Sequence, residues 1–357
     1  MKRGKRHIEA GPAPSGGAAR APTMMDVAAA AGVSQTTVSL VLNNVRGARL
    51  STQTRARVRE AALELGYALA GGGKAPQDRS GSSVIGFMAD EISTDPWCAM
   101  ELDAVREKAW EHGLTVAAAV TQGNPELEAA VLVPMLRLPL MGLIYSTVLT
   151  RRIHRQPVFS RLPTVLVNCY VPDHSVASVV PGELVGGYVA TLCLLRAGHR
   201  RIAHIHGQSW TDPSRDRLKG YRRALAEYDI LFDPALVRPG NWEPSAGHAE
   251  TLALMDLAEP PTAIFCASDM TAFGCYQALQ ERGLRVPQDV SVVGYDDREI
   301  AQFMRPALTT VILPHTEMGT QAAETLIDNV LHPEGRQPQI KVECTLVERS
   351  SVGPPPG

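Results

Sequence analysis

Beyond residue 83 the sequence alternates short apolar runs with amphipathic stretches, and this alternation limits the possible folds more than any other feature. Runs such as "SVIGFM", "TVLVN" and "TAIFCAS" have the length and composition of buried strands. Helical patterns lie between such runs, for example at 96–112 and 183–197. Strict alternation of this kind is typical of parallel sheets covered by helices on both faces. Two such series follow one another, so we expect two doubly wound lobes with a ligand cleft at the carboxyl ends of their strands.

Residues 23–67 form a different, purely helical unit. Thr23 and Asp26 have the spacing of a capping box, which predicts the start of a first short helix. Ser34 and Ser51 are good N-cap residues for a second and a third helix. Three short amphipathic helices joined by tight turns predict an all-α helix-turn-helix head.

The second helix has two contrasting faces. Its inward stripe is expected to contain Val38, Val41 and Leu42, and that of the third helix Val58, Ala61, Ala62 and Leu65. The outward stripe of the second helix contains Gln35, Thr36, Ser39, Leu40 and Asn43. Such side chains suit the major groove of DNA, where Gln can pair with adenine and Leu can lie against a thymine methyl group. An ordinary solvated face is the alternative.

Ser34 and Thr37, at the start of this helix, are placed to hold backbone phosphates. The charge distribution also favours DNA as the partner of the head. Residues 1–80 contain 12 Lys and Arg against 5 Asp and Glu, whereas residues 81–357 contain 23 against 32. A basic head joined to an acidic body is expected of a protein whose head meets a polyphosphate.

The sequence gives little support to a membrane protein, a secreted protein, a metalloprotein or an enzyme. No run of eighteen apolar residues occurs, and residues 1–22 lack the apolar segment of a secretory signal, so we expect a cytoplasmic protein without membrane contact. The six cysteines are far apart, and His204 and His206 share one face of a buried strand, so neither set predicts a metal site. No nucleotide-binding glycine motif or nucleophile elbow is present. We therefore expect no cofactor and no enzymatic activity.

These motifs carry a family resemblance. "DVAAAAGVSQTTVSLVLNN" and "STQTRARVREAALELGY" resemble the DNA-binding head of the lactose-repressor (LacI/GalR) family of transcriptional regulators. "HRRIAHIHG", "DRLKGYRRALAEY" and "PPTAIFCASDMTAFGCYQALQERGLRVPQDVSVVGYDD" resemble its ligand-binding core. The resemblance runs from about Thr23 to Glu348. It implies a homodimeric repressor that binds a partly palindromic operator on double-stranded DNA, with half-sites about one helical turn apart.

The resemblance also implies a domain plan, with two lobes like those of periplasmic binding proteins and a small effector between them. We expect the first lobe at about 83–180 and 312–338 and the second at about 181–311 and 339–348. The remaining parts are a disordered basic tail (1–22), a hinge or linker (68–82) and a flexible tail (349–357).

By the same resemblance, Arg217 and Asp296 fall at effector-binding positions on opposite walls. An Arg fork and a carboxylate suit a sugar or related polyol, and Trp242 falls where an aromatic ring stacks on the ligand. The other residues at pocket-lining positions are Asp95, Trp97, Asn168 and Ser268. The neighbouring Asp269 is expected to cap the helix that begins at Met270.

The sequence departs from the family pattern at several places, including Ser268, where an Asn is frequent, and "DPW" at 95–97, where "NPF" is usual. Leu40 stands where many members carry an arginine, which removes a fork that seeks guanine. Gly71–Gly73 and Pro76 occupy the segment that folds as a hinge helix in other members, and glycine and proline oppose a helix there. "VVPGE" at 179–183 lacks the usual Asp-Asn pair.

Three other functions remain open at this point. They are a solute-binding receptor without a DNA role, an α/β enzyme with an accessory head, and a regulator whose altered hinge weakens DNA binding. The basic three-helix head argues against a solute-binding receptor, and the absence of catalytic motifs argues against an enzyme.

Overall fold

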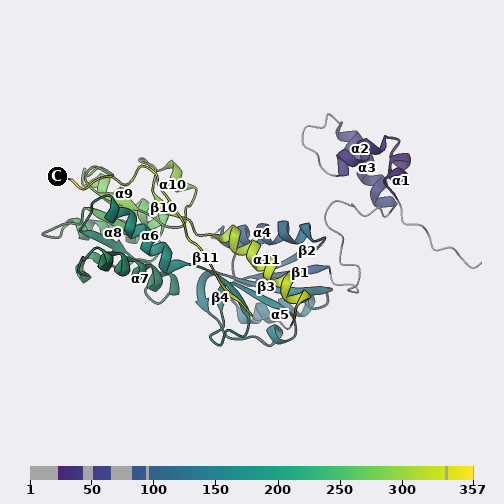
Figure 1. Ribbon diagram of the computed structural model, residues 1–357, viewed down its shortest axis with the longest axis horizontal. Coiled ribbons are helices and arrows are strands. Elements are labelled where there is room, and N and C mark those ends of the chain that lie inside the picture. Colours follow the sequence, from purple (N-terminus) through teal and green to yellow (C-terminus); the bar gives the residue numbers. More distant parts are fainter. Residues whose placement is uncertain (1–22, 43–50, 66–82, 94–95, 334–336, 357) are drawn as a thin grey trace, which may run out of the picture. The chain divides into compact units, whose positions relative to one another are not determined.

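The computed structural model describes residues 23–42, 51–65, 83–93, 96–333 and 337–356 (Figure 1). These residues form two compact units, one within residues 1–73 and one within residues 74–357. Within the described ranges no helix is both long and apolar enough to cross a lipid bilayer. The expected basic tail and the linker at 68–82 lie outside the described residues.

The first unit consists of the three expected helices, α1 (Met24–Ala31), α2 (Gln35–Leu42) and α3 (Thr52–Glu64). Thr23 and Asp26 form the capping box that opens α1. The hydroxyl of Ser34 accepts the Thr37 amide at 3.1 Å, and that of Ser51 accepts the Thr54 amide at 3.1 Å, so both expected N-caps are confirmed.

The small core of this unit is made by one face of each helix. Val27, Val38, Val41 and Val58 are fully or almost fully buried in it. The inward stripe of α2 is therefore confirmed. The expectation for Leu65 is wrong: it is 39% exposed, because α3 ends at Glu64 and the helical stripe does not reach it.

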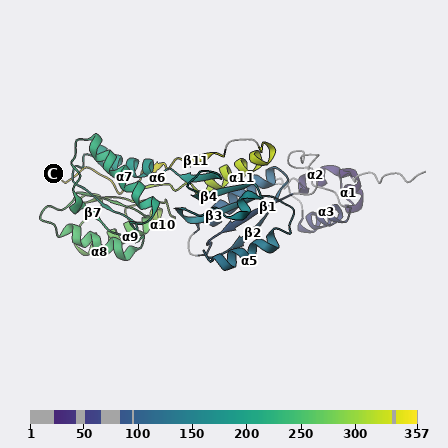
Figure 2. The same cartoon turned by 90° about the horizontal axis from the view of Figure 1, so that it is seen from below.

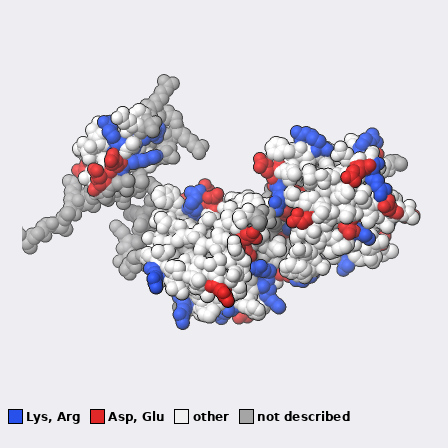
Figure 3. Space-filling model, turned by 180° about the vertical axis from the view of Figure 1, so that it is seen from behind, with Lys and Arg blue, Asp and Glu red and all other residues white. Residues whose placement is uncertain are grey.

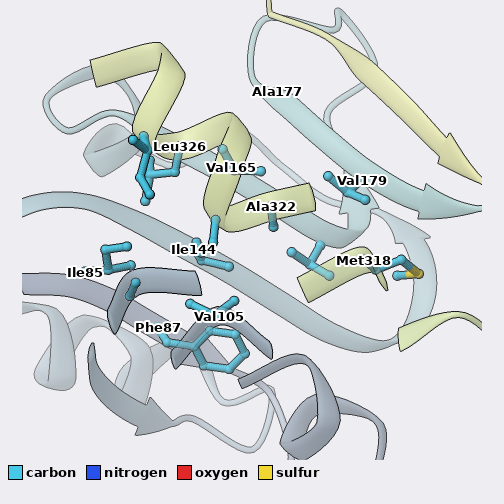
Figure 4. Close-up of a cluster of buried hydrophobic side chains, with 14 of the residues drawn as sticks. Ile85, Phe87, Val105, Ile144, Val165, Ala177, Val179, Met318, Ala322 and Leu326 are labelled. Atoms are coloured by element: carbon cyan, nitrogen blue, oxygen red, sulfur yellow. The ribbon is translucent and has the colours of Figure 1, made fainter. Parts of the chain in front are cut away.

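The first lobe of the second unit is built on a six-stranded parallel sheet with the order β11-β5-β4-β3-β1-β2. Its strands are β1 (Val84–Ala89), β2 (Thr115–Val120), β3 (Leu140–Arg152), β4 (Thr164–Tyr170), β5 (Ala177–Pro181) and β11 (Gln339–Val342). Helices α4 (Trp97–Glu111) and α11 (His315–Leu331) cover one face of the sheet, and α5 (Pro125–Met135) covers the other. Figure 4 shows Phe87 of β1 beside Val105 of α4, and Leu326 and Ala322 of α11 above the strands.

The second lobe has a four-stranded parallel sheet with the order β7-β6-β8-β9. The strands are β6 (Ile202–Ile205), β7 (Val237–Arg238), β8 (Ala263–Cys266) and β9 (Ser291–Val293). Helices α6 (Glu183–Arg196) and α7 (Asp212–Glu227) pack on one face. Helices α8 (Pro244–Met255), α9 (Asp269–Glu281) and α10 (Ile300–Phe303) pack on the other (Figure 2). The expected two-lobed α/β core is confirmed.

Three chain segments connect the lobes. The chain passes from β5 to α6, returns from β10 (Thr310–Val311) to α11, and crosses again between β11 and β12 (Leu346–Val347). β10 and β12 pair antiparallel beside the second lobe. The assignment of all of 339–348 to the second lobe is therefore wrong, because Gln339–Val342 pairs with β5 in the first sheet.

The expected flexible tail at 349–357 is also wrong for the residues described there. Ser351 is fully buried, and its hydroxyl donates to the carbonyl of Val292 at 2.6 Å. His199 is hydrogen-bonded to the carbonyl of Gly353 at 2.9 Å. These bonds dock the segment onto the second lobe.

Helices α6 and α7 cross at close range, which fixes the position of the functional side chains on α7. A Cβ atom at Gly220 would overlap the carbonyl oxygen of Leu184, and one at Gly187 would overlap the backbone of Arg217. Only glycine permits this approach at both positions. The crossing holds Arg217 against the first turn of α6.

Candidate functional site

The first candidate site is the outward face of α2. Gln35 is exposed on it, Ser39 and Thr37 are partly exposed, and the apolar stripe faces the core. The hydroxyls of Ser34 and Thr37 lie 2.9 Å apart at the start of the helix. The side chains of Thr36 and Leu40, and the whole of Asn43, are outside the described part of the chain. The short helix therefore presents Gln35 in its first turn, where the helix dipole favours an anion.

The second candidate site is a cavity of about 370 Å³ between the two lobes of the second unit, which we call the inter-lobe cavity. Six of the seven residues expected at the effector site line it: Trp97, Asn168, Arg217, Trp242, Ser268 and Asp296. The seventh, Asp95, lies outside the described residues. Figure 3 shows acidic and basic side chains next to each other along the boundary between the lobes.

Arg217 is the most constrained side chain of this cavity. Its guanidinium donates to both carboxylate oxygens of Glu183, from Nε at 2.7 Å and from Nη2 at 2.9 Å, and Nη1 donates to the carbonyl of Ala267. Burial by itself would lower the pKa of Arg217, but Glu183, Tyr295 and Asp296 together outweigh it and the pKa is raised. Arg217 is therefore a permanently charged group whose fork is already held by a carboxylate of the protein.

Asp296 lies on the opposite side of this guanidinium, with Oδ1 3.7 Å from Nη1 of Arg217. Burial raises the pKa of Asp296 to about 8, even though Arg217 lowers it. A carboxyl group with such a pKa carries a proton over much of the neutral range and can both donate and accept a hydrogen bond.

Three of the lining residues have left-handed backbone conformations, which residues other than glycine rarely adopt. The φ angles are 56° at Asn168, 72° at Trp242 and 108° at Asp296. Strain of this kind collects at functional sites, where surrounding structure holds it in place. The Trp242 ring lies where a Cβ at Gly207 would be, so glycine is needed there to admit it.

Ser268 and Asn168, both expected to bind the effector, form hydrogen bonds to other groups of the protein. The Ser268 hydroxyl caps α9 by accepting the Thr271 amide at 3.1 Å, and it donates to the carbonyl of Trp242 at 3.1 Å. The expectation that Asp269 is the cap is therefore wrong: it is the first residue of α9, and its carboxylate accepts the Arg298 amide at 2.7 Å and the Thr310 hydroxyl at 2.6 Å.

Asn168 similarly holds the end of β3. Its amide nitrogen donates to the carbonyl of Val148 at 2.7 Å, and its amide oxygen accepts the Thr150 hydroxyl. Asn168 and Ser268 thus shape the walls of the inter-lobe cavity.

Two of the contacts between the lobes lie beside the cavity, among the residues that the structure describes. The guanidinium carbon of Arg298, from the second lobe, lies 4.8 Å from the centre of the Trp97 ring of the first lobe. The Tyr170 hydroxyl, from the first lobe, donates to Asp212 at 2.8 Å. A ligand that alters either contact changes the free energy of lobe closure.

Sequence reasoning missed several polar residues of the inter-lobe cavity, namely Asp90, Glu91, Thr150, Arg151, Glu183, Gln208, Asn241, Glu243 and Arg298. Some of them carried a usable signal. Asp90 follows β1 directly, and Thr150 and Arg151 lie in the last three residues of β3. Such positions lie at the carboxyl edge of a parallel sheet.

We predict that Asp296→Asn weakens the pH dependence of stability between pH 6.5 and pH 8. Because burial raises the pKa of Asp296 to about 8, the folded protein keeps a proton there that the unfolded chain has released. Stability then falls as the pH rises through this window, by at most about 1.4 kcal/mol per pH unit for one group.

Burial lowers the pKa of His204 to about 3, so its contribution near pH 6.5 has the opposite sign. That contribution is the same in the wild type and the variant, so the difference between their slopes reports Asp296. Burial raises the pKa of Asp269 to about 7, and its smaller contribution, of the same sign as that of Asp296, stays in the variant. Urea unfolding at both ends of the window measures the slope. Equal slopes for wild type and variant would show that Asp296 does not retain the proton.

Comparisons with known proteins agree with this division of the chain. Residues 23–68 match the family "Bacterial regulatory proteins, lacI family", and residues 192–352 match the periplasmic binding protein-like domain family. The Ribose operon repressor of Escherichia coli K12 is 33% identical over 92% of this chain and 99% of its own length.

Two solved structures are similar over both units. One is a complex of the transcriptional regulator CelR with cellobiose, with a TM-score of 0.64 and 29% identity over 92% of this chain and 99% of that one. The other is the lac repressor dimer bound to operator and the anti-inducer ONPF, with a TM-score of 0.65 and 26% identity over 94% of this chain and all of that one.

Proposed function

The chain belongs to the lacI family of bacterial regulatory proteins, which are DNA-binding transcriptional regulators, and on that basis we propose that it is a repressor controlled by a small molecule in the inter-lobe cavity. It acts as a homodimer in the cytoplasm on a partly palindromic operator. The effector is a sugar or related polyol. The cavity binds this ligand without chemical turnover.

One observation carries the proposal: a capped helix with an outward polar face occurs in the same chain as a two-lobed core with a polar cavity. The E. coli relative is named a ribose operon repressor, and the CelR structure contains cellobiose. Carboxyl, amide and guanidinium groups beside two tryptophan rings suit a hydroxylated ring.

The roles of the lining residues follow from their contacts. Asp296 exchanges hydrogen bonds with ligand hydroxyls, and Trp242 covers an apolar ring face. The Trp97 ring stacks on His315 and lies under Arg298, and so forms part of the cavity wall. Arg217, fixed by Glu183, supplies the remaining N–H groups. Asp95, on the segment just before α4, is assigned to the same site by its place in the family pattern. Ligand contacts from both lobes favour the closed core, and this bias changes the affinity of the paired heads for the operator.

A ligand screen followed by DNA titration tests the proposal. Sugars and polyols that raise the melting temperature of the full chain are identified first, since a true ligand stabilises the folded state. Each is then added to a fluorescence titration with operator DNA. We expect a change in operator affinity of about 5- to 150-fold. If every stabilising ligand leaves that affinity unchanged, effector control is wrong, whereas operator binding itself is judged by the titration without ligand.

We predict that Leu40→Arg changes the operator preference of the protein. Leucine offers only apolar contact to a base pair, whereas an arginine fork pairs with guanine and discriminates by about 1–3 kcal/mol. Selection of bound sequences from randomised DNA, run in parallel for wild type and variant, measures the change. Identical selected motifs would refute a base-facing role for Leu40.

A further inference from the structure

We propose that the effector carries an anionic group, a phosphate ester or a carboxylate, which binds an arginine-lined site at the outer end of the inter-lobe cavity. This inference rests on the proposed function and narrows its ligand to an acidic sugar or sugar phosphate. The hydroxylated ring lies in the inter-lobe cavity, and the anionic group lies toward the solvent.

The proposed site is a second cavity of about 470 Å³, which we call the outer cavity. It shares Leu149, Thr150 and Arg151 with the inter-lobe cavity, so the two cavities lie next to each other at the end of β3. It also includes Arg152 from the first lobe and Arg215 from the second. A ligand that reaches from one cavity into the other therefore contacts both lobes.

The two cavities differ in the sign of their charge. The inter-lobe cavity is lined by five carboxyl groups and three guanidinium groups. The outer cavity is lined by three guanidinium groups, those of Arg151, Arg152 and Arg215, and by the single carboxylate of Asp212. An anion is repelled by the first lining and attracted by the second. A ligand with a neutral ring and one terminal anionic group matches both linings: the ring lies in the inter-lobe cavity and the anion in the outer cavity.

The carboxylates near the outer cavity do not neutralise all three of its guanidinium groups. Asp212 bonds to Arg215 and also accepts the Tyr170 hydroxyl at 2.8 Å, and Arg151 lies 3.1 Å from Asp90. Among the described residues no carboxylate lies within ion-pair distance of Arg152, which is exposed at the last position of β3.

Arg152 and Arg215 line the same cavity from different lobes, beside the Tyr170 hydroxyl. The charges of Arg152 and Arg215 both lower the pKa of the Tyr170 phenol, although burial and Asp212 raise it overall. Arg152 and Arg215 thus face the same group from the two lobes. Guanidinium groups bind phosphate and carboxylate oxygens through paired, charge-assisted hydrogen bonds. An anion held between them joins the lobes as an ion pair would.

Inorganic phosphate is the direct probe of the outer cavity, because its binding does not depend on the identity of the ring. The melting temperature of the full chain is measured in phosphate and in chloride at equal ionic strength. We expect phosphate to stabilise the wild type and Arg152→Lys, and to bind Arg152→Gln about tenfold more weakly. Arg161→Gln is the matched control, since Arg161 is exposed on the same lobe and lies in neither cavity. If Arg152→Gln gains as much stability from phosphate as the wild type, the proposal is wrong.

Matched sugars then identify the anionic group. Ribose is compared with ribose 5-phosphate, glucose with glucose 6-phosphate and glucuronate, and cellobiose serves as a neutral two-ring ligand. We expect one anionic member to bind at least about tenfold tighter than its neutral parent, with that advantage lost in Arg152→Gln. Tighter binding of a sugar phosphate would indicate a phosphate site, and tighter binding of glucuronate a carboxylate site.

Equal or tighter binding of the neutral parent or of cellobiose would overturn the anionic site and leave the proposed repressor function intact. Operator binding of the ligand-free protein is measured on the same samples. A wild type that binds no operator contradicts the proposed function, whatever the sugars and phosphate do.

Discussion

Glu183→Gln is expected to lower the free energy of unfolding of the second unit by about 3–5 kcal/mol, the cost of leaving a buried charge without its partner. Arg217 and Glu183 are both almost fully buried, with side chains 3% and 4% exposed. The substitution keeps the size of the side chain but removes the charge that compensates the guanidinium. Asp296, at 3.7 Å and with a pKa raised to about 8, is a poor substitute for it.

Urea unfolding followed by tryptophan fluorescence measures this effect. All four tryptophans lie in the second unit, so the signal reports on that unit alone. The double variant Glu183→Leu with Arg217→Met removes both charges and should recover most of the lost stability. A loss below about 1 kcal/mol in Glu183→Gln would mean that the pair is not the anchor of the cavity wall.

Gln35→Ala is expected to weaken operator binding by about 1–3 kcal/mol for each half-site, and therefore by at least about thirtyfold for a dimer on two half-sites. Gln35 is exposed, so its truncation should leave the fold of the head unchanged. Binding to non-operator DNA depends mainly on phosphate contacts and should change little.

The matched control for this prediction is Glu60→Ala, a truncation of an exposed side chain on α3. Fluorescence titrations with operator and with shuffled DNA are compared for the three proteins. If Gln35→Ala and Glu60→Ala have equal effects on operator affinity, Gln35 does not read bases.

The local structure of the head was predictable because its signals are local. Ser34, Ser51 and the Thr23–Asp26 pair cap helices through bonds to residues three positions away, and the buried stripe of α2 follows from helical spacing alone. Ser268 and Asp269 mark the limit of this reasoning. Both are good caps, and only the tertiary bonds of Asp269 to Arg298 and Thr310 decide between them.

The missed elements lack such signals. Helix α8 buries Gly247, Thr251 and Leu254, so its inward face has no apolar stripe. Strand β11 is short, alternates exposed and half-buried residues, and pairs with β5, which lies far away in the sequence. Residues 349–356 dock through hydrogen bonds of Ser351 and of the backbone, and these leave no hydrophobic pattern.

The cavity was partly predictable for a similar reason. Arg217, Trp242 and Asp296 follow a family pattern and lie together. Glu183 carried no signal of its own, because its importance comes from the close crossing of α6 and α7, which brings it to Arg217.

Selection from a pool of randomised duplex DNA tests directly whether the outward face of α2 reads base pairs. The wild-type protein should enrich a partly palindromic sequence with half-sites about one helical turn apart, and Gln35→Ala should lose the preference at one base pair of each half-site. Enrichment of no sequence beyond what a basic control protein of equal charge retains would contradict base reading by this face.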